Sequence, residues 1–280
     1  MSKIKIVTDS TMDMPKDMIE KLGIEVVPLA ITIDGETYFD RVNLEPVEFI
    51  TMMENSNELP KSSQPSTGSF LEVYDKLGQE GYEVLSIHMT GKMSGTVRSA
   101  ESAAQMSETK VTVLDSQFIS KALAFQVKEA AEMANQGKTM EEILDRLETV
   151  RNHTKLYIMV DTLENMVKGG RIGKGKAFIG SLLNIKPIAS LEGAEYNPVA
   201  KVRSHSQVVK YMAKQFAEDV KGKTIRGVGI AHAEAQELSQ KIKDSIYELT
   251  GFQDVEIDYT GPTVSTHTGP GALALMYYFD

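Results

Sequence analysis

The sequence contains no cysteine and no tryptophan. The absence of cysteine excludes a disulfide framework, a catalytic thiol and a metal site built on thiolates. Long hydrophobic runs are also missing: the longest purely apolar stretch covers residues 272–279, whereas a membrane-spanning helix needs about 18 apolar residues. Residues 259–279 carry no charge, but prolines and glycines interrupt them. We therefore expect a buried, loop-bearing segment there and no integral membrane span.

Positive charge is also scarce, since 30 basic residues face 39 acidic ones and leave a net charge of −9. A surface this negative repels phosphate backbones and anionic lipid heads, so we expect no nucleic acid as a partner. The N-terminus carries no targeting pattern, because the chain reaches Asp9 after only two consecutive apolar residues. These features predict a cytoplasmic protein.

Methionine, in contrast, is frequent, with 15 residues in 280. Its flexible, polarizable side chain fills irregular core space and also makes adaptable walls for ligands. Composition alone leaves both uses open.

Short β-branched runs alternate with helical patterns along most of the chain, which predicts α/β architecture: mostly parallel sheets flanked by helices. The predicted strands are 3–8, 25–33, 83–88, 110–114, 155–160, 186–190, 225–231 and 253–257. The predicted helices are 15–22, 46–53, 70–79, 95–106, 119–135, 140–152, 206–219 and 234–249, and Thr139 with Glu142 forms a capping box.

A length of 280 residues corresponds to about two domains at roughly 150 residues each. We place the N-terminal α/β domain at 1–155 and the C-terminal one at 156–280, with an approximate boundary. The last strand could return to the first domain.

Hydroxyl side chains follow several of the predicted strands, at the edge where open α/β sheets bind ligands. Such clusters occur at 8–11, 62–67, 94–96 and 260–268. Hydroxyls and helix N-terminal amides suit a carboxylate or phosphate oxygen, although Ser and Thr also favour caps and turns without any ligand.

Three look-alike motifs carry no function. The segment 170–177 resembles a phosphate loop but has Ala177 where Mg²⁺ would need a hydroxyl. The glycines at 269–271 mimic a dinucleotide fingerprint, yet too little chain follows for a second strand. The histidines never fall three to five residues apart, so no local metal pair exists.

An alternative function is a stand-alone hydrolase or phosphotransferase acting on a small anionic substrate. It would use Ser94 and His267, with Asp9 nearby in the topology. The Gly-x-Ser-x-Gly elbow of α/β-hydrolases does not occur. A regulatory protein without an enzymatic partner is a third hypothesis.

Basic residues gather in one part of the second half: Lys168, Arg171, Lys174 and Lys176, followed by Lys201 and Arg203. Such a cluster on an acidic chain points to an anion or an acidic partner.

Six short motifs in register make the chain resemble the DegV family over nearly its whole length. They are Thr8-Asp-Ser-Thr-Met-Asp-Met-Pro15, Ser62-Ser-Gln-Pro65, Met93-Ser-Gly-Thr96, Gly169-Gly-Arg-Ile172, Lys201-Val-Arg203 and Thr266-His-Thr-Gly-Pro-Gly-Ala272. The family is similar to the fatty-acid-binding subunits of bacterial fatty-acid kinase. The resemblance implies two α/β domains, with the ligand head group in the cleft between them.

The same resemblance implies a lipid-binding protein that does no catalysis itself and holds a long-chain fatty acid in an apolar tunnel. It would present the carboxylate to a separate kinase subunit, which uses ATP and Mg²⁺ to make acyl phosphate for phospholipid synthesis. The chain itself would bind no cofactor and no metal, and a transient membrane contact stays open. The acyl length and unsaturation, the identity of the kinase and the oligomeric state also stay open.

The site residues implied by the resemblance fall into three sets. The fatty-acid carboxylate would be bound by Ser62, Ser94 and His267. The acyl phosphate or the kinase would be faced by Arg171 and Arg203. The head-group loops would include Ser10, Ser63, Gly95, Thr96, Thr266 and Gly269.

Two departures from the family pattern are visible. Ser62 stands where threonine is common, and Ala122 and Ala124 replace two glycines that the family has after Asp115. A close backbone approach to ligand at these alanines is therefore in doubt.

Overall fold

The computed structural model describes residues 3–174 and 185–280, which form an α/β fold with three sheets. The first sheet has the order β2-β1-β6-β7, and all its neighbours are parallel. Its strands are β1 (Lys3–Asp9), β2 (Glu25–Val27), β6 (Tyr82–His88) and β7 (Val111–Asp115). Such connections need crossover helices, which the alternating sequence pattern supplies.

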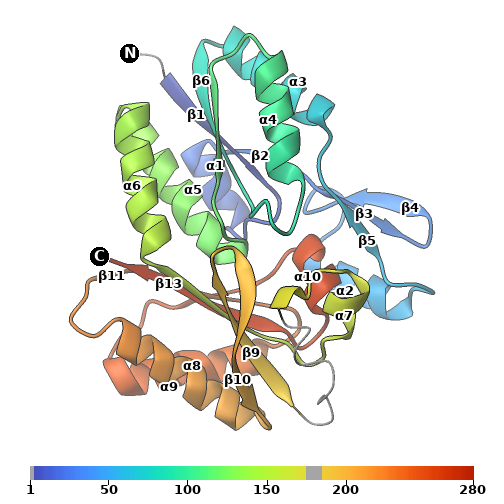
Figure 1. Ribbon diagram of the computed structural model, residues 1–280, viewed down its shortest axis with the longest axis vertical. Helices are drawn as coiled ribbons and strands as arrows, with labels where there is room; N and C mark the ends of the chain where they lie inside the picture. Colours follow the sequence, from blue (N-terminus) through green and yellow to red (C-terminus); the bar gives the residue numbers. More distant parts are fainter. Residues whose placement is uncertain (1–2, 175–184) are drawn as a thin grey trace.

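Helices cover both faces of this sheet (Figure 1). Phe70 and Tyr74 of α3 (Thr67–Gln79) and Ala100 of α4 (Thr96–Met106) pack on one face against Val7 and Val84. The opposite face is covered by α1 (Lys16–Leu22), α5 (Ser120–Asn135) and α6 (Met140–Asn152). The capping box predicted at the start of α6 is confirmed.

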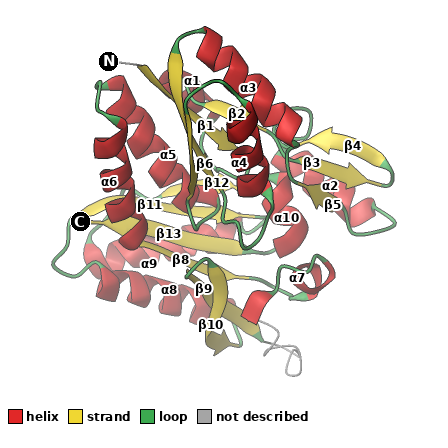
Figure 2. Ribbon diagram, turned by 45° about the horizontal axis from the view of Figure 1, so that its top comes forward, coloured by secondary structure: helices red, strands yellow, loops and turns green. Residues whose placement is uncertain are grey.

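The second sheet contains six strands in the order β10-β9-β8-β13-β11-β12. They are β8 (Thr154–Met159), β9 (Lys186–Glu192), β10 (Glu195–Val202), β11 (Ile225–His232), β12 (Glu256–Tyr259) and β13 (Leu273–Phe279). Two helices, α8 (His205–Asp219) and α9 (Gln236–Thr250), cover its outer face through the apolar cluster of Val208, Phe216 and Ile242. Figure 2 shows α5 and α6 on one side of this sheet and α8 and α9 on the other.

The prediction of mostly parallel sheets is wrong for this second sheet. Of its described pairings, only β11 with β12 is parallel. For β9 and β10 the physical reason is a tight turn at Gly193 and Ala194, both with positive φ, which joins the two strands as a hairpin and leaves no room for a crossover helix. The sequence pattern also did not reveal β13, which lies between β8 and β11.

The last strand does not return to the first sheet, because β12 pairs with β11 and β13 also lies in the six-stranded sheet. The predicted strand 25–33 is two strands. Pro28, which has no N–H to donate to a ladder, separates β2 from β3 (Ala30–Ile33). The predicted helices are all present within a few residues of their expected ends.

A small third sheet, ordered β4-β3-β5, was not predicted. It consists of β3 with β4 (Glu36–Phe39) and β5 (Lys61–Ser63), and it packs on α2 (Pro46–Asn55) through Ile31, Phe49 and Ile50. Two further short helices, α7 (Glu164–Lys168) and α10 (Pro262–Thr268), lie beside it (Figure 1). No helix in the described ranges has both the length and the apolar character needed to cross a membrane.

One apolar cluster joins the two large sheets. It contains Ile6 and Leu85 of the first sheet, Leu123 of α5, and Leu156 and Tyr278 of the second sheet. The two halves of the chain therefore share a core, with α5 between the sheets.

This shared core predicts a single cooperative unfolding transition. We expect Leu147→Ala, a buried change on α6, to cost about 3 kcal/mol and to lower the melting temperature of the whole protein as one event. Differential scanning calorimetry checks this through the ratio of calorimetric to van't Hoff enthalpy. Two separable transitions, with only one of them shifted, would contradict a common core.

Candidate functional site

A cavity of about 300 Å³ lies where loops from both halves of the chain meet α10. Its lining combines hydroxyl and amide side chains with apolar ones, and none of the lining residues is acidic. They are Thr11, Leu29, Ser62, Ser63, Gln64, Met89, Met93, Ser94, Ile119, Met166, Arg171, Tyr196, Thr263, Val264, His267 and Thr268.

Ser62 and His267 are hydrogen-bonded in this cavity, with 2.8 Å between Oγ and Nε2. Ser62 lies on β5 and His267 in the last turn of α10. Gly169 permits this arrangement, because a Cβ at that position would lie 2.3 Å from His267 Nδ1. The strand, the helix and the glycine together fix the imidazole against the serine.

The imidazole of His267 is neutral at physiological pH. Burial, and then the positive charge of Arg171, lower its pKa from 6.5 to about 4. Nδ1 is buried and has no hydrogen-bond partner among the described residues. Because an unpaired buried N–H is less tolerable than an unpaired lone pair, we infer that Nε2 carries the proton and donates to Ser62. The Ser62 hydroxyl hydrogen is then free to point into the cavity.

Ser94 lies in the loop between β6 and α4. Its Oγ is 2.8 Å from Oγ1 of Thr96 and accepts a 3.3 Å hydrogen bond from the Thr96 N–H. Thr96 is fully buried, so it serves as a fixed support for Ser94.

Arg171 supplies positive charge at the same cavity. Its guanidinium donates to two backbone carbonyls, Gly169 O at 2.6 Å and Met93 O at 3.3 Å. Within the described ranges no carboxylate pairs with it, whereas Lys168 is paired with Glu164 and Lys174 with Glu195. The arginine charge therefore remains available to an anion.

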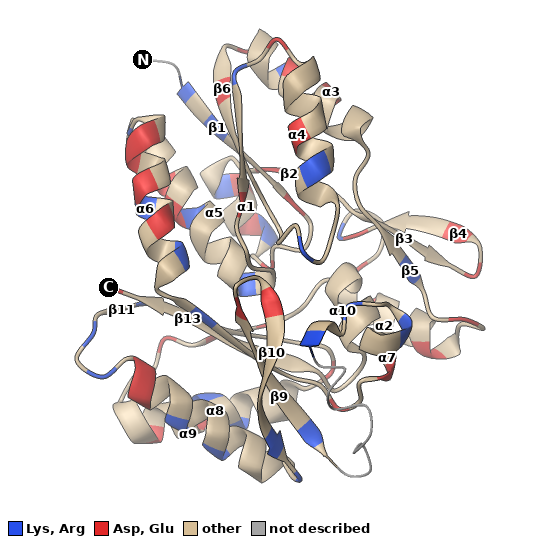
Figure 3. Ribbon diagram, in the orientation of Figure 1, with Lys and Arg blue, Asp and Glu red and all other residues tan. Residues whose placement is uncertain are grey.

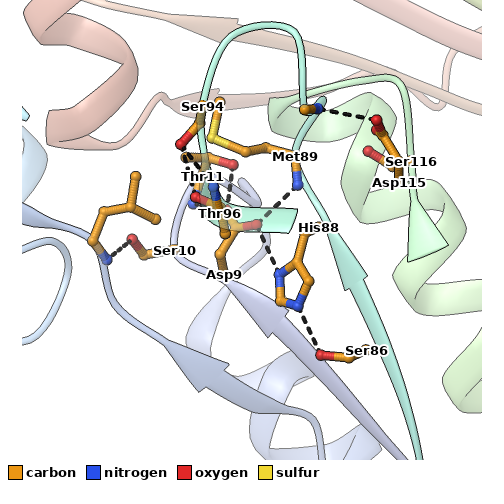
Figure 4. A network of polar contacts seen from close by, with 12 residues as sticks. Asp9, Ser10, Thr11, Ser86, His88, Met89, Ser94, Thr96, Asp115 and Ser116 are labelled. Carbon is orange, nitrogen blue, oxygen red and sulfur yellow. Dashed lines mark hydrogen bonds and ion pairs between the residues drawn. The ribbon is translucent and has the colours of Figure 1, made fainter. Parts of the chain in front are cut away.

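The loops that carry these residues are held by a buried polar network (Figure 4). One oxygen of Asp9 accepts from the N–H of Met89 and contacts His88 Nδ1, and the other accepts from the N–H and hydroxyl of Thr11. Burial alone would raise the pKa of Asp9, but these hydrogen bonds and the contact with His88 lower it. A single carboxylate thus fixes the loops that lead to Thr11 and Ser94.

His88 continues the network inward, with Nε2 at 2.7 Å from Ser86 Oγ, which in turn accepts from the hydroxyl of Tyr74. Asp9, His88 and Ser86 therefore resemble a catalytic triad in their order. All three are almost completely buried, so no substrate reaches Ser86 and the network is a support.

Apolar residues border the cavity on the side of the second sheet. A neighbouring cavity of about 20 Å³ shares Ile119, Tyr196, Val264 and Thr268 with it and is also lined by Leu156, Ile158, Ala231, Ala272 and Ala274. Three of the chain's methionines, Met89, Met93 and Met166, line the main cavity. These methionines therefore form part of its wall.

The structure gathers Ser62, Ser63, Ser94, His267 and Arg171 at this one cavity. Arg203 is exposed, its N–H is bound by Gln207, and it does not line the cavity. Lys176 and Ala177 lie outside the described residues.

The other residues predicted for the head-group loops lie behind the lining. Ser10 accepts from the N–H of Leu29, and Thr266 donates to Pro262 O. The side chain of Gln64 packs closely on Gly95, which has no Cβ to prevent this contact. Gly269 has a positive φ and packs against the side chain of Asn165. Ala122 and Ala124 lie buried in α5 and do not line the cavity.

The predicted site residues did not include several lining residues, chiefly Thr263, Val264 and Thr268 on α10, although the hydroxyl cluster at 260–268 contains them. A helix at this point was indicated by Pro262, because proline favours the first helical position. Gln64 follows Ser62 in the motif used above and was also missed.

The whole chain has close relatives. A family model described as "Uncharacterised protein, DegV family" matches residues 3–280. A DegV domain-containing protein of Listeria monocytogenes is 43% identical, over 100% of both chains. One from Staphylococcus aureus is 38% identical, over 99% of both.

Two solved structures agree closely with this fold. A DegV family protein from Thermus thermophilus, described for its fatty acid binding, has a TM-score of 0.93 and 33% identity, covering 99% of this chain and 100% of that one. DegV from Bacillus subtilis, described as a fatty acid binding protein, has a TM-score of 0.91 and 34% identity, covering 100% of both.

The neutral state of His267 predicts a specific pH dependence of stability. The unfolded chain takes up a proton on this histidine as the pH falls below about 6.5, whereas the folded chain does so only near pH 4. Ligand-free wild-type protein should therefore lose about 3 kcal/mol of unfolding free energy between pH 6.5 and pH 4, a loss that His267→Gln should not show. Urea unfolding at several pH values measures the difference, and parallel curves for the two proteins would contradict a buried neutral imidazole.

Proposed function

The chain belongs to the DegV family, and from this premise we propose that it is a fatty-acid-binding protein. It holds a long-chain fatty acid with the carboxylate at Ser62, Ser94 and His267 and the acyl tail along the apolar walls. The observation that carries this proposal is a cavity with hydrogen-bond donors at one end, no acidic residue in its lining, and apolar residues on the side of the second sheet. It is supported by the relatives from Thermus thermophilus and Bacillus subtilis, which are described as binding fatty acids.

The energetics favour such a ligand. A 16-carbon chain buries about 14 methylenes at roughly 0.8 kcal/mol each, or about 11 kcal/mol in all. Association and ordering costs reduce this gain, and an unpaired buried carboxylate would cancel it. The hydroxyls of Ser62 and Ser94, together with the His267 imidazole that positions Ser62, provide the pairing that the carboxylate requires.

We further propose that the bound carboxylate is presented to a separate kinase subunit, which supplies ATP and Mg²⁺ and forms acyl phosphate in the cytoplasm. Arg171 lies at the mouth, since it also lines an outer hollow with Lys61, Lys168 and His267. Figure 3 shows basic and acidic residues side by side around α7, where Lys61 pairs with Glu58 and Lys168 with Glu164, so Arg171 is the cation of this hollow without a described carboxylate partner. Arg203, exposed beside α8, is proposed to face the kinase.

The alternative of a hydrolase using Ser94 and His267 is less well supported. The hydrogen bonds of these two side chains lead to Thr96 and Ser62, and Asp9 is engaged by His88. An imidazole whose pKa is about 4 is also a weak general base at neutral pH.

Lipid analysis tests the binding proposal. We expect denaturation of the purified protein to release about one fatty acid per chain, identified by mass spectrometry. Ser62→Ala should weaken fatty-acid affinity about tenfold, because one hydrogen bond to a buried charge is lost. Ser206→Ala, an exposed serine on α8, is the matched control and should bind normally. Absence of any fatty acid, both as purified and after addition, would refute the proposal.

The kinase step is tested separately with Arg171→Ala. This variant should retain fatty acid, because the hydroxyls remain, but should not support ADP formation when a fatty-acid kinase catalytic subunit and ATP are added. Arg151→Ala, at the distant end of α6, should behave as wild type. If Arg171→Ala loses the fatty acid to the same extent as Ser62→Ala, its assignment to the kinase step is wrong.

A further inference from the structure

Two buried carboxylates and a half-buried arginine form a cluster where four segments of the chain meet. Asp13 follows β1, Asp40 follows β4, and Arg41 is its neighbour. Asp13 and Asp40 are each 1% exposed. None of these residues lines the head-group cavity, so direct contact with the ligand does not explain their burial.

Asp13 accepts hydrogen bonds from four donors on three other segments. Arg41 Nη2 lies 2.6 Å and Gly261 N 2.9 Å from one carboxylate oxygen, and Ser120 Oγ lies 2.5 Å and Thr260 Oγ1 2.7 Å from the other. Arg41 also donates to Tyr259 O at 3.0 Å. The carboxylate and the guanidinium together fix the loop that leads into α10.

Asp40 holds the first turn of that helix, since its Oδ2 accepts from the N–H of Thr263 at 3.1 Å. Four cavity residues, Thr263, Val264, His267 and Thr268, lie on α10. The position of this short helix therefore sets the position of the His267 ring.

Asp40 is also connected to Ser62, through the pairing of the strands in the small sheet. It directly follows β4, where Phe39 pairs with Ala30 of β3, and Ala30 pairs in turn with Ser63 of β5. Ser62 is the preceding residue of β5 and pairs with Ile31. Asp40 thus links the small sheet that carries Ser62 to the helix that carries His267.

From these contacts we propose that Asp40, together with Asp13 and Arg41, is a positioning residue that sets the imidazole of His267 against the Ser62 hydroxyl. As a positioning role for fatty-acid recognition, this inference rests on the proposed function.

The composition of the cluster supports a positioning role. Two buried carboxylates lie near one arginine, which pairs with Asp13, and apolar residues of similar size often stabilise a fold equally well. Burial raises the pKa of the Asp40 carboxyl to about 7, and its Oδ1 has no hydrogen-bond partner among the described residues. Burying the Asp40 carboxyl costs free energy. We attribute its presence here to the position that it imposes on α10.

The test is the pKa of His267 in lipid-free protein, measured by NMR with ¹³C-labelled histidine and assigned with His267→Gln. Asp40→Ala removes the acceptor for Thr263 and should raise this pKa by about one unit or more, because a displaced α10 hydrates the ring. Asp40→Asn keeps an acceptor oxygen and should keep the wild-type pKa.

Two further variants complete the design. Gly261→Ala keeps both carboxylates but places a Cβ 3.1 Å from Asp40 Oδ1 and 3.2 Å from Arg41 Nε. It should shift the pKa in the same direction, and it decides the test if Asp40→Ala does not fold. Glu129→Ala is the matched control, because it removes a carboxylate paired with Arg146 on the far side of α5; it should lower stability without moving the His267 pKa.

An unchanged His267 pKa in both folded variants, or an equal shift in Glu129→Ala, would overturn the positioning role. Because this readout uses lipid-free protein, it is independent of fatty-acid binding. If the pKa shifts as expected but even wild type binds no fatty acid, the proposed function fails and the positioning role stands.

Discussion

The hydrogen bond between Ser62 and His267 is the contact on which the site depends. It joins residues 205 positions apart in the chain, one on a strand of the small sheet and one on a short helix that precedes the last strand. A neutral imidazole that donates to the serine leaves the serine proton for a ligand. Gly169, Arg171 and the burial of the ring all act on this one pair.

The charges around the cavity restrict the class of ligand that it can bind. The chain is acidic overall, yet no acidic side chain lines the cavity, and Arg171 brings a positive charge without a described carboxylate partner. Two buried acids behind the site act as supports: Asp9 binds the loops of Thr11 and Met89, and Asp13 binds the loop before α10. A carboxylate ligand would supply the negative charge that balances Arg171.

The sequence predicted most local structure, because helices and the parallel strands depend on short-range periodicity and on caps such as Thr139. It did not predict the small sheet or the antiparallel second sheet. Short strands such as β5 are stabilised by distant partners, and the positive φ of Ala194 is not encoded by a glycine. For the site, hydroxyl clusters at 62–67 and 94–96 and the motif around His267 indicated the right loops. The sequence contained no signal that Asp9, Asp13 and Asp40 support these loops, because their partners lie far away in the chain.

We propose that the cavity recognises a carboxylate at the head of an apolar chain. Equilibrium binding of palmitic acid and of hexadecanol, which has the same tail but no charge, tests this most directly. We expect the acid to bind at least about tenfold more tightly, since hydrogen bonds to a charged group contribute about 1.5–3 kcal/mol. Equal affinity for the acid and the alcohol would contradict it.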